Sequence, residues 1–183
     1  MNTLVICGTN RPGAHTHKVA NWVYKTAKKG SNKHQIIFID FHKFKLPWLG
    51  EPATNSVKTW SRAVEKADAL IIVTPEYNHG YPGYLKNALD LVYKELNYKP
   101  ILVCGVSAGL GGGMRAVEQL RLILIEFRAV PIREAVYFRT AGELFDRNGE
   151  IKDKTYEKAL DQALKELFFL AASLKLARQK KPF

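Results

Sequence analysis

The segment 74–83, with the sequence TPEYNHGYPG, holds the densest ligand-binding chemistry in the chain. Its turn-forming residues predict an irregular path that leaves backbone N–H and C=O groups free for a ligand. Asn78 adds an amide, and Tyr77 and Tyr81 add aromatic faces, so the segment could hold a planar polar ring. An ordinary connection between a strand and a helix can have the same composition, so this segment alone leaves both interpretations open.

The segment 8–16, with the sequence GTNRPGAHT, follows a short apolar run and precedes a helical pattern. Backbone N–H groups at the start of a helix point outward, and the helix dipole favours an anion there. Thr9 and Thr16 add hydroxyl groups, and Arg11 adds a positive charge. We therefore expect a phosphate group in this loop; a plain turn without a ligand is the alternative.

Two common phosphate motifs do not fit the same segment. Gly8 and Gly13 have the spacing of a P-loop, but Ala14 and His15 stand where that motif needs Lys and Ser or Thr. The dinucleotide fingerprint needs a glycine where this chain has Asn10. A single phosphate group therefore fits the loop better than a nucleoside triphosphate or a dinucleotide.

A third segment, 107–113, is rich in glycine. Its glycines are Gly109, Gly111, Gly112 and Gly113. Glycine adopts positive φ and lets the backbone approach a flat ligand closely. A flexible connection without a ligand is the alternative interpretation.

Apolar runs alternate with helical patterns along the chain. Strands are predicted at 4–7, 34–40, 69–73, 101–106 and 131–138, and helices from 16 onward and over 57–66, 82–96, 114–128 and 155–177. The first, third and fourth strands are apolar throughout, as in a parallel sheet covered on both faces. The pattern predicts an α/β three-layer sandwich with a five-stranded parallel sheet, and the 183 residues predict a single domain over 1–183.

All loops that lead from a parallel strand into a helix emerge at the same edge of the sheet. The segments 8–16, 75–82 and 107–113 should therefore converge, because each follows a predicted strand. A planar ring held between the second and third loops, with its phosphate in the first, describes flavin mononucleotide (FMN).

The chain resembles the family of NAD(P)H-dependent FMN reductases, which includes quinone, azo and chromate reductases. The motifs that carry the resemblance are GTNRPG at 8–13, Leu46-Pro47 with Glu51-Pro52, TPEYNHG at 74–80, KNALD at 86–90, GGG at 111–113, Arg115-Ala116 and EQLR at 118–121. The resemblance implies a flavodoxin-like fold with strand order 2-1-3-4-5, FMN bound without a covalent bond, and a homodimer or homotetramer.

The resemblance also implies which residues bind FMN. They are Thr9, Arg11, Thr16, His17, Lys18 and Val19 at the phosphate; Pro75, Glu76, Tyr77 and Asn78 at the ribityl chain and ring; and Ser107, Ala108, Gly109 and Gly111 at the other edge of the ring. Many members of the family have Arg where this chain has Ala14. His15, His17 and Lys18 are the residues that could compensate for the missing charge.

The expected activity is transfer of electrons from NADPH or NADH through FMN to a small acceptor, such as a quinone, an azo compound, free flavin or a metal oxyanion. Hydride transfer to a flavin is the chemistry of the cofactor, so we expect no catalytic side chain. His79 is the nearest candidate proton donor, and a histidine that merely shapes the turn is the favoured alternative.

Two functions from other classes compete with this expectation. A non-enzymatic electron carrier of the flavodoxin type would share the fold, but flavodoxins are acidic and this chain has a net charge of +11. That charge also suits a nucleic-acid-binding module. The predicted helix 114–128 nevertheless lacks a basic stripe interleaved with aromatic residues, so we expect no nucleic-acid partner.

Metal, membrane and disulfide chemistry are not expected. His15 and His17 have no Cys, Asp or Glu beside them in the sequence, which makes a poor metal site. No apolar run is long enough to span a membrane, and no segment has the pattern of a signal peptide. Cys7 and Cys104 fall inside predicted strands without a CxxC motif, which favours buried thiols in a reducing, cytoplasmic compartment.

Overall fold

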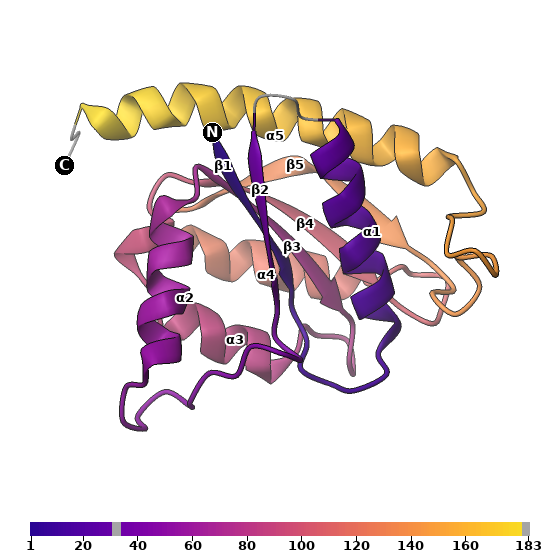
Figure 1. Cartoon of the computed structure of the whole chain (residues 1–183), viewed down its shortest axis with the longest axis horizontal. Coiled ribbons are helices and arrows are strands. Elements are labelled where there is room, and N and C mark those ends of the chain that lie inside the picture. Colours follow the sequence, from indigo (N-terminus) through magenta and orange to yellow (C-terminus); the bar gives the residue numbers. More distant parts are fainter. Residues whose placement is uncertain (31–33, 181–183) are drawn as a thin grey trace.

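The computed structural model describes residues 1–30 and 34–180. Its sheet consists of β1 (Asn2–Cys7), β2 (Gln35–Asp40), β3 (Ala69–Pro75), β4 (Pro100–Val106) and β5 (Val130–Phe138). The strands pair in parallel in the order β2-β1-β3-β4-β5, and their arrowheads point to the same side of the molecule (Figure 1). The predicted α/β class and the flavodoxin-like order 2-1-3-4-5 are confirmed.

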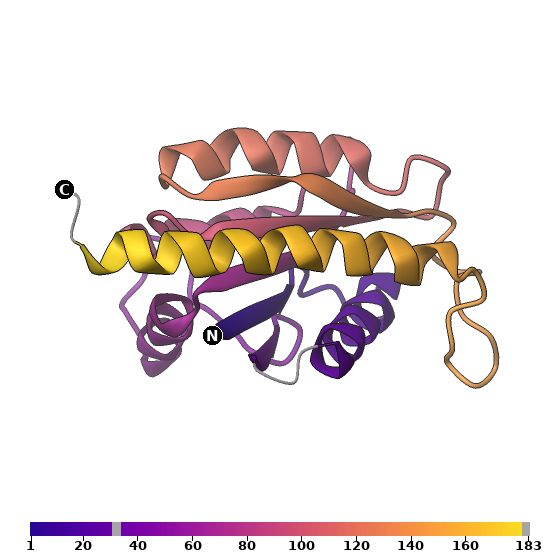
Figure 2. The same cartoon turned by 90° about the horizontal axis from the view of Figure 1, so that it is seen from above.

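Helices cover both faces of the sheet. They are α1 (His15–Lys29), α2 (Asn55–Lys66), α3 (Gly83–Asp90), the 3-10 helix η1 (Lys94–Leu96), α4 (Met114–Glu126) and α5 (Thr155–Gln179). α1 and α5 pack on one face, and the other helices pack on the opposite face. α5 is longer than the sheet, and its C-terminal part extends past the strands (Figure 2). Within the described residues, no helix has both the length and the apolar character that crossing a membrane requires.

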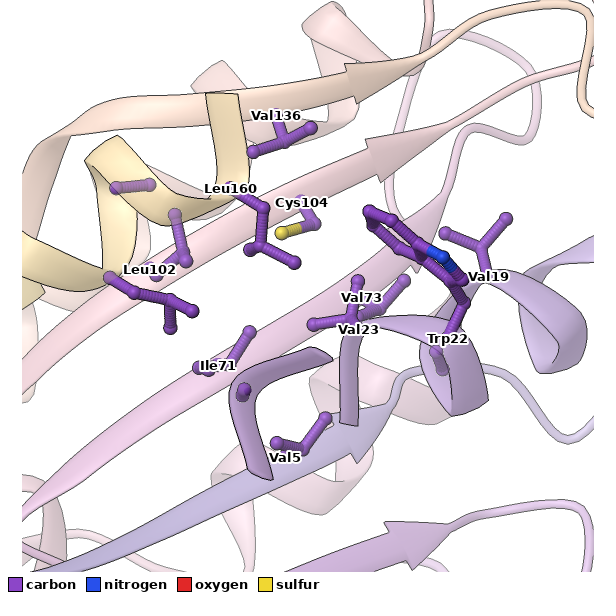
Figure 3. Close-up of a cluster of buried hydrophobic side chains, with 14 of the residues drawn as sticks. Val5, Val19, Trp22, Val23, Ile71, Val73, Leu102, Cys104, Val136 and Leu160 are labelled. Carbon is purple, nitrogen blue, oxygen red and sulfur yellow. The ribbon is translucent and has the colours of Figure 1, made fainter. Parts of the chain in front are cut away.

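The alternation of side chains along each central strand builds the two cores. On β3, Leu70 and Ile72 face α2, α3 and α4, whereas Ile71 and Val73 face α1 and α5. In the core shown in Figure 3, Val73 lies close to Trp22 of α1. Because both faces are covered, β3 and β4 are buried at every position, and the apolar runs within them are the pattern that predicted them.

The helix predicted over 82–96 is wrong in its second half, where α3 ends and a turn leads to η1. The indole N–H of Trp60, on α2, donates to the carbonyl of Ala88 at 2.7 Å. That carbonyl would accept from Val92 if the helix continued, and Val92 instead donates to Leu89 at 3.1 Å. A contact from another helix therefore accompanies the early end of α3, and the local pattern could not reveal it.

Pro82 was expected at the first helical position of this helix. It is instead the cap residue before α3, in an extended conformation with ψ 141°. The other predicted elements begin and end within two residues of the observed bounds.

The contact between Trp60 and Ala88 can be tested through stability. Trp60→Phe should lower the free energy of unfolding by about 1–3 kcal/mol, because it leaves a buried carbonyl without its donor. Trp48→Phe is the control, because Trp48 is 54% exposed, and it should change stability by less than about 0.5 kcal/mol. Urea unfolding followed by circular dichroism measures both values. Equal effects of the two variants would contradict this account of Trp60.

Candidate functional site

The loops that follow β1, β3 and β4 meet at the edge where the strands end. They enclose a cavity of about 370 Å³ lined by 11–16, 75–77, 106–108 and Ala141. This volume lies within the range of small-molecule sites, about 300–1,000 Å³. Larger hollows of about 560 Å³ and 1010 Å³ lie between α1 and the segment 145–150 and beside η1, and neither shares a lining residue with this cavity. The chemistry of the lining residues, and not size, distinguishes the candidate site.

The first loop leads into the uncapped N-terminus of α1. Ala14 precedes the helix in an extended conformation, and no side chain among the described residues caps it. The first turn also contains no acidic residue. The backbone N–H groups at this end, together with the helix dipole, therefore favour an anion in the cavity. This arrangement fits a phosphate group.

Thr9 connects the first loop to the second. Its side chain is buried, and its hydroxyl accepts from the backbone N–H of Arg11 at 3.2 Å and lies 3.2 Å from the hydroxyl of Tyr77. The guanidinium carbon of Arg11 lies 5.7 Å from the centre of the Tyr77 ring, within the range of cation–π contacts. A charged group and an aromatic ring are thus held together at the cavity wall.

The second loop is a tight reverse turn. Tyr77 and Gly80 exchange backbone hydrogen bonds of 2.8 Å and 3.0 Å, and Asn78 and His79 between them have φ of 49° and 67°. This left-handed conformation is uncommon outside glycine, and asparagine tolerates it best. Gln119 of α4 donates to the carbonyl of His79 at 2.9 Å, which fastens the tip of the turn to α4.

Glu76 fastens the base of the same loop. Its carboxylate accepts from the backbone N–H of Arg115 at 3.0 Å and from the Arg115 guanidinium at 3.1 Å. The side chain is only 11% exposed. Glu76 therefore satisfies a backbone donor in the first turn of α4, where a negative charge is favoured by the helix dipole.

The glycines of the third loop separate into two groups. A Cβ on Gly105, in β4, would lie 2.5 Å from the carbonyl oxygen of Gly112 and 2.9 Å from that of Gly113. Gly112 and Gly113 also have φ of 61° and 83°. These three residues let the third loop fold back against β4. Gly109 has open space around its Cβ position, and Gly111 approaches only Met114, at 4.0 Å.

The residues predicted to bind FMN do not all meet in the cavity. Its lining includes Arg11, Thr16, Pro75, Glu76, Tyr77, Ser107 and Ala108. Thr9 lies buried beside it, Asn78 is at the tip of the second loop, and Gly109 and Gly111 lie outside the lining. Lys18 borders the separate hollow beside α1, and Val19 belongs to the core.

His17 is turned toward β2. Its Nδ1 lies 3.1 Å from Asp40 Oδ1 and 3.3 Å from Cys7 Sγ, and its Nε2 lies 2.9 Å from the carbonyl of Arg11. The sequence argument against a metal depended on the missing partners of the histidines. The fold supplies such partners to His17 from the ends of β1 and β2.

Sequence reasoning missed several lining residues and supports. Pro12, Gly13 and Ala141 line the cavity, as does His15, which was considered only as a compensating charge. Asp40 and His42 support the first loop from the end of β2, since Asp40 contacts His17, and His42 Nδ1 lies 3.3 Å from the carbonyl of Asn10. The available signal was the adjacency of the first and second strands, which brings the end of the second strand to the first loop.

The family of the chain follows from its sequence. Residues 1–143 match the profile of a protein family described as NADPH-dependent FMN reductase. The chain belongs to this family. It is an NAD(P)H-dependent oxidoreductase of the FMN reductase and quinone reductase type, and the reaction proceeds through FMN.

Individual relatives agree with the family. The NAD(P)H-dependent FMN reductase C4B3.06c of Schizosaccharomyces pombe is 33% identical over 145 residues, which cover 73% of this FMN reductase and 71% of that protein. The NADH:(hydroxy)cinnamate reductase subunit CrdA of Vibrio ruber is 34% identical over 173 residues, covering 91% and 85% of the two chains. Among solved structures, FerB, a flavoenzyme NAD(P)H:(acceptor) oxidoreductase from Paracoccus denitrificans, superposes with a TM-score of 0.78 at 26% identity, covering 94% and 97%.

The glycine contacts of this FMN reductase generate a prediction. Gly105→Ala should lower the free energy of unfolding by about 1–3 kcal/mol or more, because the new Cβ meets backbone atoms that cannot move aside. Gly109→Ala is the matched control in open space, and it should change stability by less than about 0.5 kcal/mol. Urea unfolding measures both, and a Gly105→Ala protein as stable as the control would contradict the close packing of this loop.

Proposed function

We propose that the cavity of about 370 Å³ binds FMN and that the enzyme passes electrons from NADPH or NADH to small acceptors at this site. Bound FMN would supply the redox chemistry, which is hydride transfer from the nicotinamide and electron transfer to the acceptor. The observation that carries the proposal is the convergence of three loops around one cavity, with an uncapped helix start and Arg11 at one end. A quinone, an azo compound, free flavin or a metal oxyanion is the proposed acceptor.

The first loop would hold the phosphate. The N–H groups of the first turn of α1, the hydroxyl of Thr16 and the guanidinium of Arg11 offer hydrogen bonds and positive charge on the same wall. His17 and Lys18, included from the family resemblance, contribute less in this proposal. The polar atoms of His17 face Asp40 and the Arg11 carbonyl, and Lys18 borders another hollow.

The second and third loops would hold the ring and the ribityl chain. Tyr77 is positioned by Thr9, the base of the second loop is positioned by Glu76, and Ser107 donates to the carbonyl of Gly109 at 2.9 Å. Open space at Gly109 would let the third-loop backbone approach the ring and offer N–H donors to an anionic ring edge. These residues bind and orient, and we assign them no proton transfer.

His79 is proposed to shape the turn. Its backbone is left-handed, its carbonyl accepts from Gln119, and it borders a hollow shared with Met114, Arg115 and Tyr137, away from the residues that line the proposed FMN cavity. A non-enzymatic carrier is not retained as an alternative, because the chain belongs to a family of reductases.

Visible absorbance of the purified protein tests the function. Added FMN should bind, and anaerobic addition of NADPH or NADH should bleach the flavin absorbance. Bleaching should then reverse when a quinone is added. Absence of FMN binding at micromolar concentration would overturn the proposal, and bound flavin that neither nucleotide reduces would contradict the reductase activity.

The phosphate assignment predicts a selective loss. Arg11→Ala should weaken FMN binding about tenfold to a hundredfold, because a charge-assisted hydrogen bond contributes about 1.5–3 kcal/mol. Riboflavin lacks the phosphate, so its affinity should change by no more than about twofold. Lys18→Ala removes the same charge outside the cavity and should leave FMN affinity nearly unchanged. Fluorescence titration measures these affinities, and equal losses for FMN and riboflavin would show that Arg11 acts through the Tyr77 ring.

A second copy of the chain is proposed to cover the outer face of α3 and α4. A hollow of about 540 Å³ there is lined by the apolar residues Leu49, Val92, Tyr93, Leu122, Ile123 and Phe127. Lys86, Asp90 and Glu126 border it, and the presence of both charge signs suits a self-complementary twofold contact. We therefore propose a homodimer or homotetramer.

We also infer a reducing compartment, such as the cytoplasm, supported by the unpaired thiols of Cys7 and Cys104.

The assembly can be tested at one exposed residue. Leu122→Glu should shift the protein toward monomers, because it places a charge in the apolar contact; Leu122 is 71% exposed in the single chain. Phe169→Glu is the matched control, since Phe169 is also 71% exposed but lies on α5. Light scattering after size-exclusion chromatography gives the mass. A monomeric unaltered protein, or an unchanged mass for Leu122→Glu, would reject this interface.

A further inference from the structure

Three potential metal ligands converge outside the proposed flavin cavity. Cys7 ends β1, His17 lies in the first turn of α1, and Asp40 ends β2. Parallel pairing brings Cys7 and Asp40 opposite each other in register. Nδ1 of His17 lies 3.3 Å from Cys7 Sγ and 3.1 Å from Asp40 Oδ1, and all three atoms lie within 4.8 Å of one another.

The other ring nitrogen fixes the orientation of the His17 ring. Nε2 lies 2.9 Å from the carbonyl oxygen of Arg11, which can only accept a hydrogen bond, so Nε2 carries a proton. In a neutral imidazole Nδ1 then presents a lone pair to a carboxylate oxygen and a sulfur. Electron-rich atoms at these distances repel one another unless a proton or a cation lies among them. The thiol proton of Cys7, a second proton on the His17 ring or a metal ion can fill that role.

The donor set matches zinc chemistry. Zinc binds thiolate sulfur at about 2.3 Å, imidazole nitrogen at about 2.0–2.1 Å and carboxylate oxygen at about 2.0–2.2 Å. A tetrahedron with these bonds has edges of about 3.4–3.6 Å between ligand atoms. The separations of 3.3 Å and 3.1 Å at His17 Nδ1 are within a few tenths of an ångström of these edges.

The surroundings of the cluster resemble the outer shell of a metal site. Ligating histidines usually donate their second ring nitrogen to a carbonyl or carboxylate, as His17 does to Arg11. Asp40 Oδ1 also accepts from the backbone N–H of His42 at 3.0 Å, which orients the carboxylate. Cys7 is fully buried, whereas the side chains of His17 and Asp40 are 19% and 14% exposed. An ion can therefore reach the cluster from the partly exposed side formed by His17 and Asp40.

We propose that Cys7, His17 and Asp40 bind one Zn²⁺ ion, with solvent in the fourth position. On binding, the S–H bond of Cys7 breaks, a sulfur–zinc bond forms, and the proton passes to the buffer. No group is oxidised or reduced. The ion would join the ends of β1 and β2 to the first turn of α1. The proposal does not depend on the proposed flavin site.

Proton release gives the proposal a quantitative signature. Burial, reinforced by the charge of Asp40, raises the pKa of the Cys7 thiol, so the free thiol is protonated before the ion binds. The titratable groups that face it are His17 and Asp40, and the ring of His42 lies 5.2 Å from that of His17. Above the pH range in which histidine titrates, one proton released per ion makes zinc affinity rise about tenfold per pH unit.

Calorimetric titration with zinc chloride tests the site on the full chain after dialysis against a chelator. We expect one Zn²⁺ per chain and release of one proton, measured in buffers of different ionisation enthalpy. Cys7→Ser and Asp40→Asn should each weaken binding at least about tenfold. Cys104→Ser is the matched control, because Cys104 is equally buried in a strand but belongs to no ligand cluster among the described residues.

X-ray absorption at the zinc edge provides a second readout. It should show one sulfur ligand and otherwise nitrogen and oxygen ligands. If Cys7→Ser does not fold, the Asp40→Asn titration and the sulfur signal decide the question. Absence of binding, undiminished binding by Asp40→Asn, or a zinc site without sulfur would overturn the proposal. Each of these results would mean that the protons of Cys7 and His17, and not a metal, hold this cluster together.

Discussion

The parallel hydrogen bonding of β1 with both β2 and β3 is the constraint on which the site depends. In this register Cys7 lies opposite Asp40 on one side and opposite Val73 on the other. The ends of β1, β2 and β3 are thereby aligned at one edge. The first loop is then held from both sides, by residues that follow β2 and by the loop that follows β3. A shift of one residue would turn every side chain of β1 to the opposite core.

Rigid contacts behind the cavity hold loops that would otherwise be flexible. Glu76 and Gln119 join the second loop to α4, and the close approach of Gly105 to Gly112 presses the third loop onto β4. These contacts lie beside or beneath the lining of the cavity. The chain therefore uses some of its polar and glycine residues to position the loops, and it leaves backbone groups and Arg11 to face a ligand.

The sequence predicted the features that depend on local pattern. Apolar runs located the strands, and the position of the loops after them located the cavity. The strand order came from the family resemblance. Contacts between distant segments were out of reach: the donation from Trp60 to Ala88 and the packing of Gly105 on Gly112. His17 shows the limit clearly, because the family resemblance placed it at the phosphate, whereas its partners in space are Asp40 and Cys7.

The uncapped start of α1 has a consequence for how the helix is held together. A side-chain cap at this position would contribute about 0.5–2 kcal/mol to helix stability, and Ala14 contributes none of it. In the proposed function, a bound phosphate would complete the hydrogen bonding of the first turn in place of that cap. The free energy of ligand binding would then also stabilise the first turn of α1 against fraying, so that a change in one would appear as a change in the other. Amide hydrogen exchange in the first turn of α1 would report occupancy of the cavity, without any change in the rest of the fold.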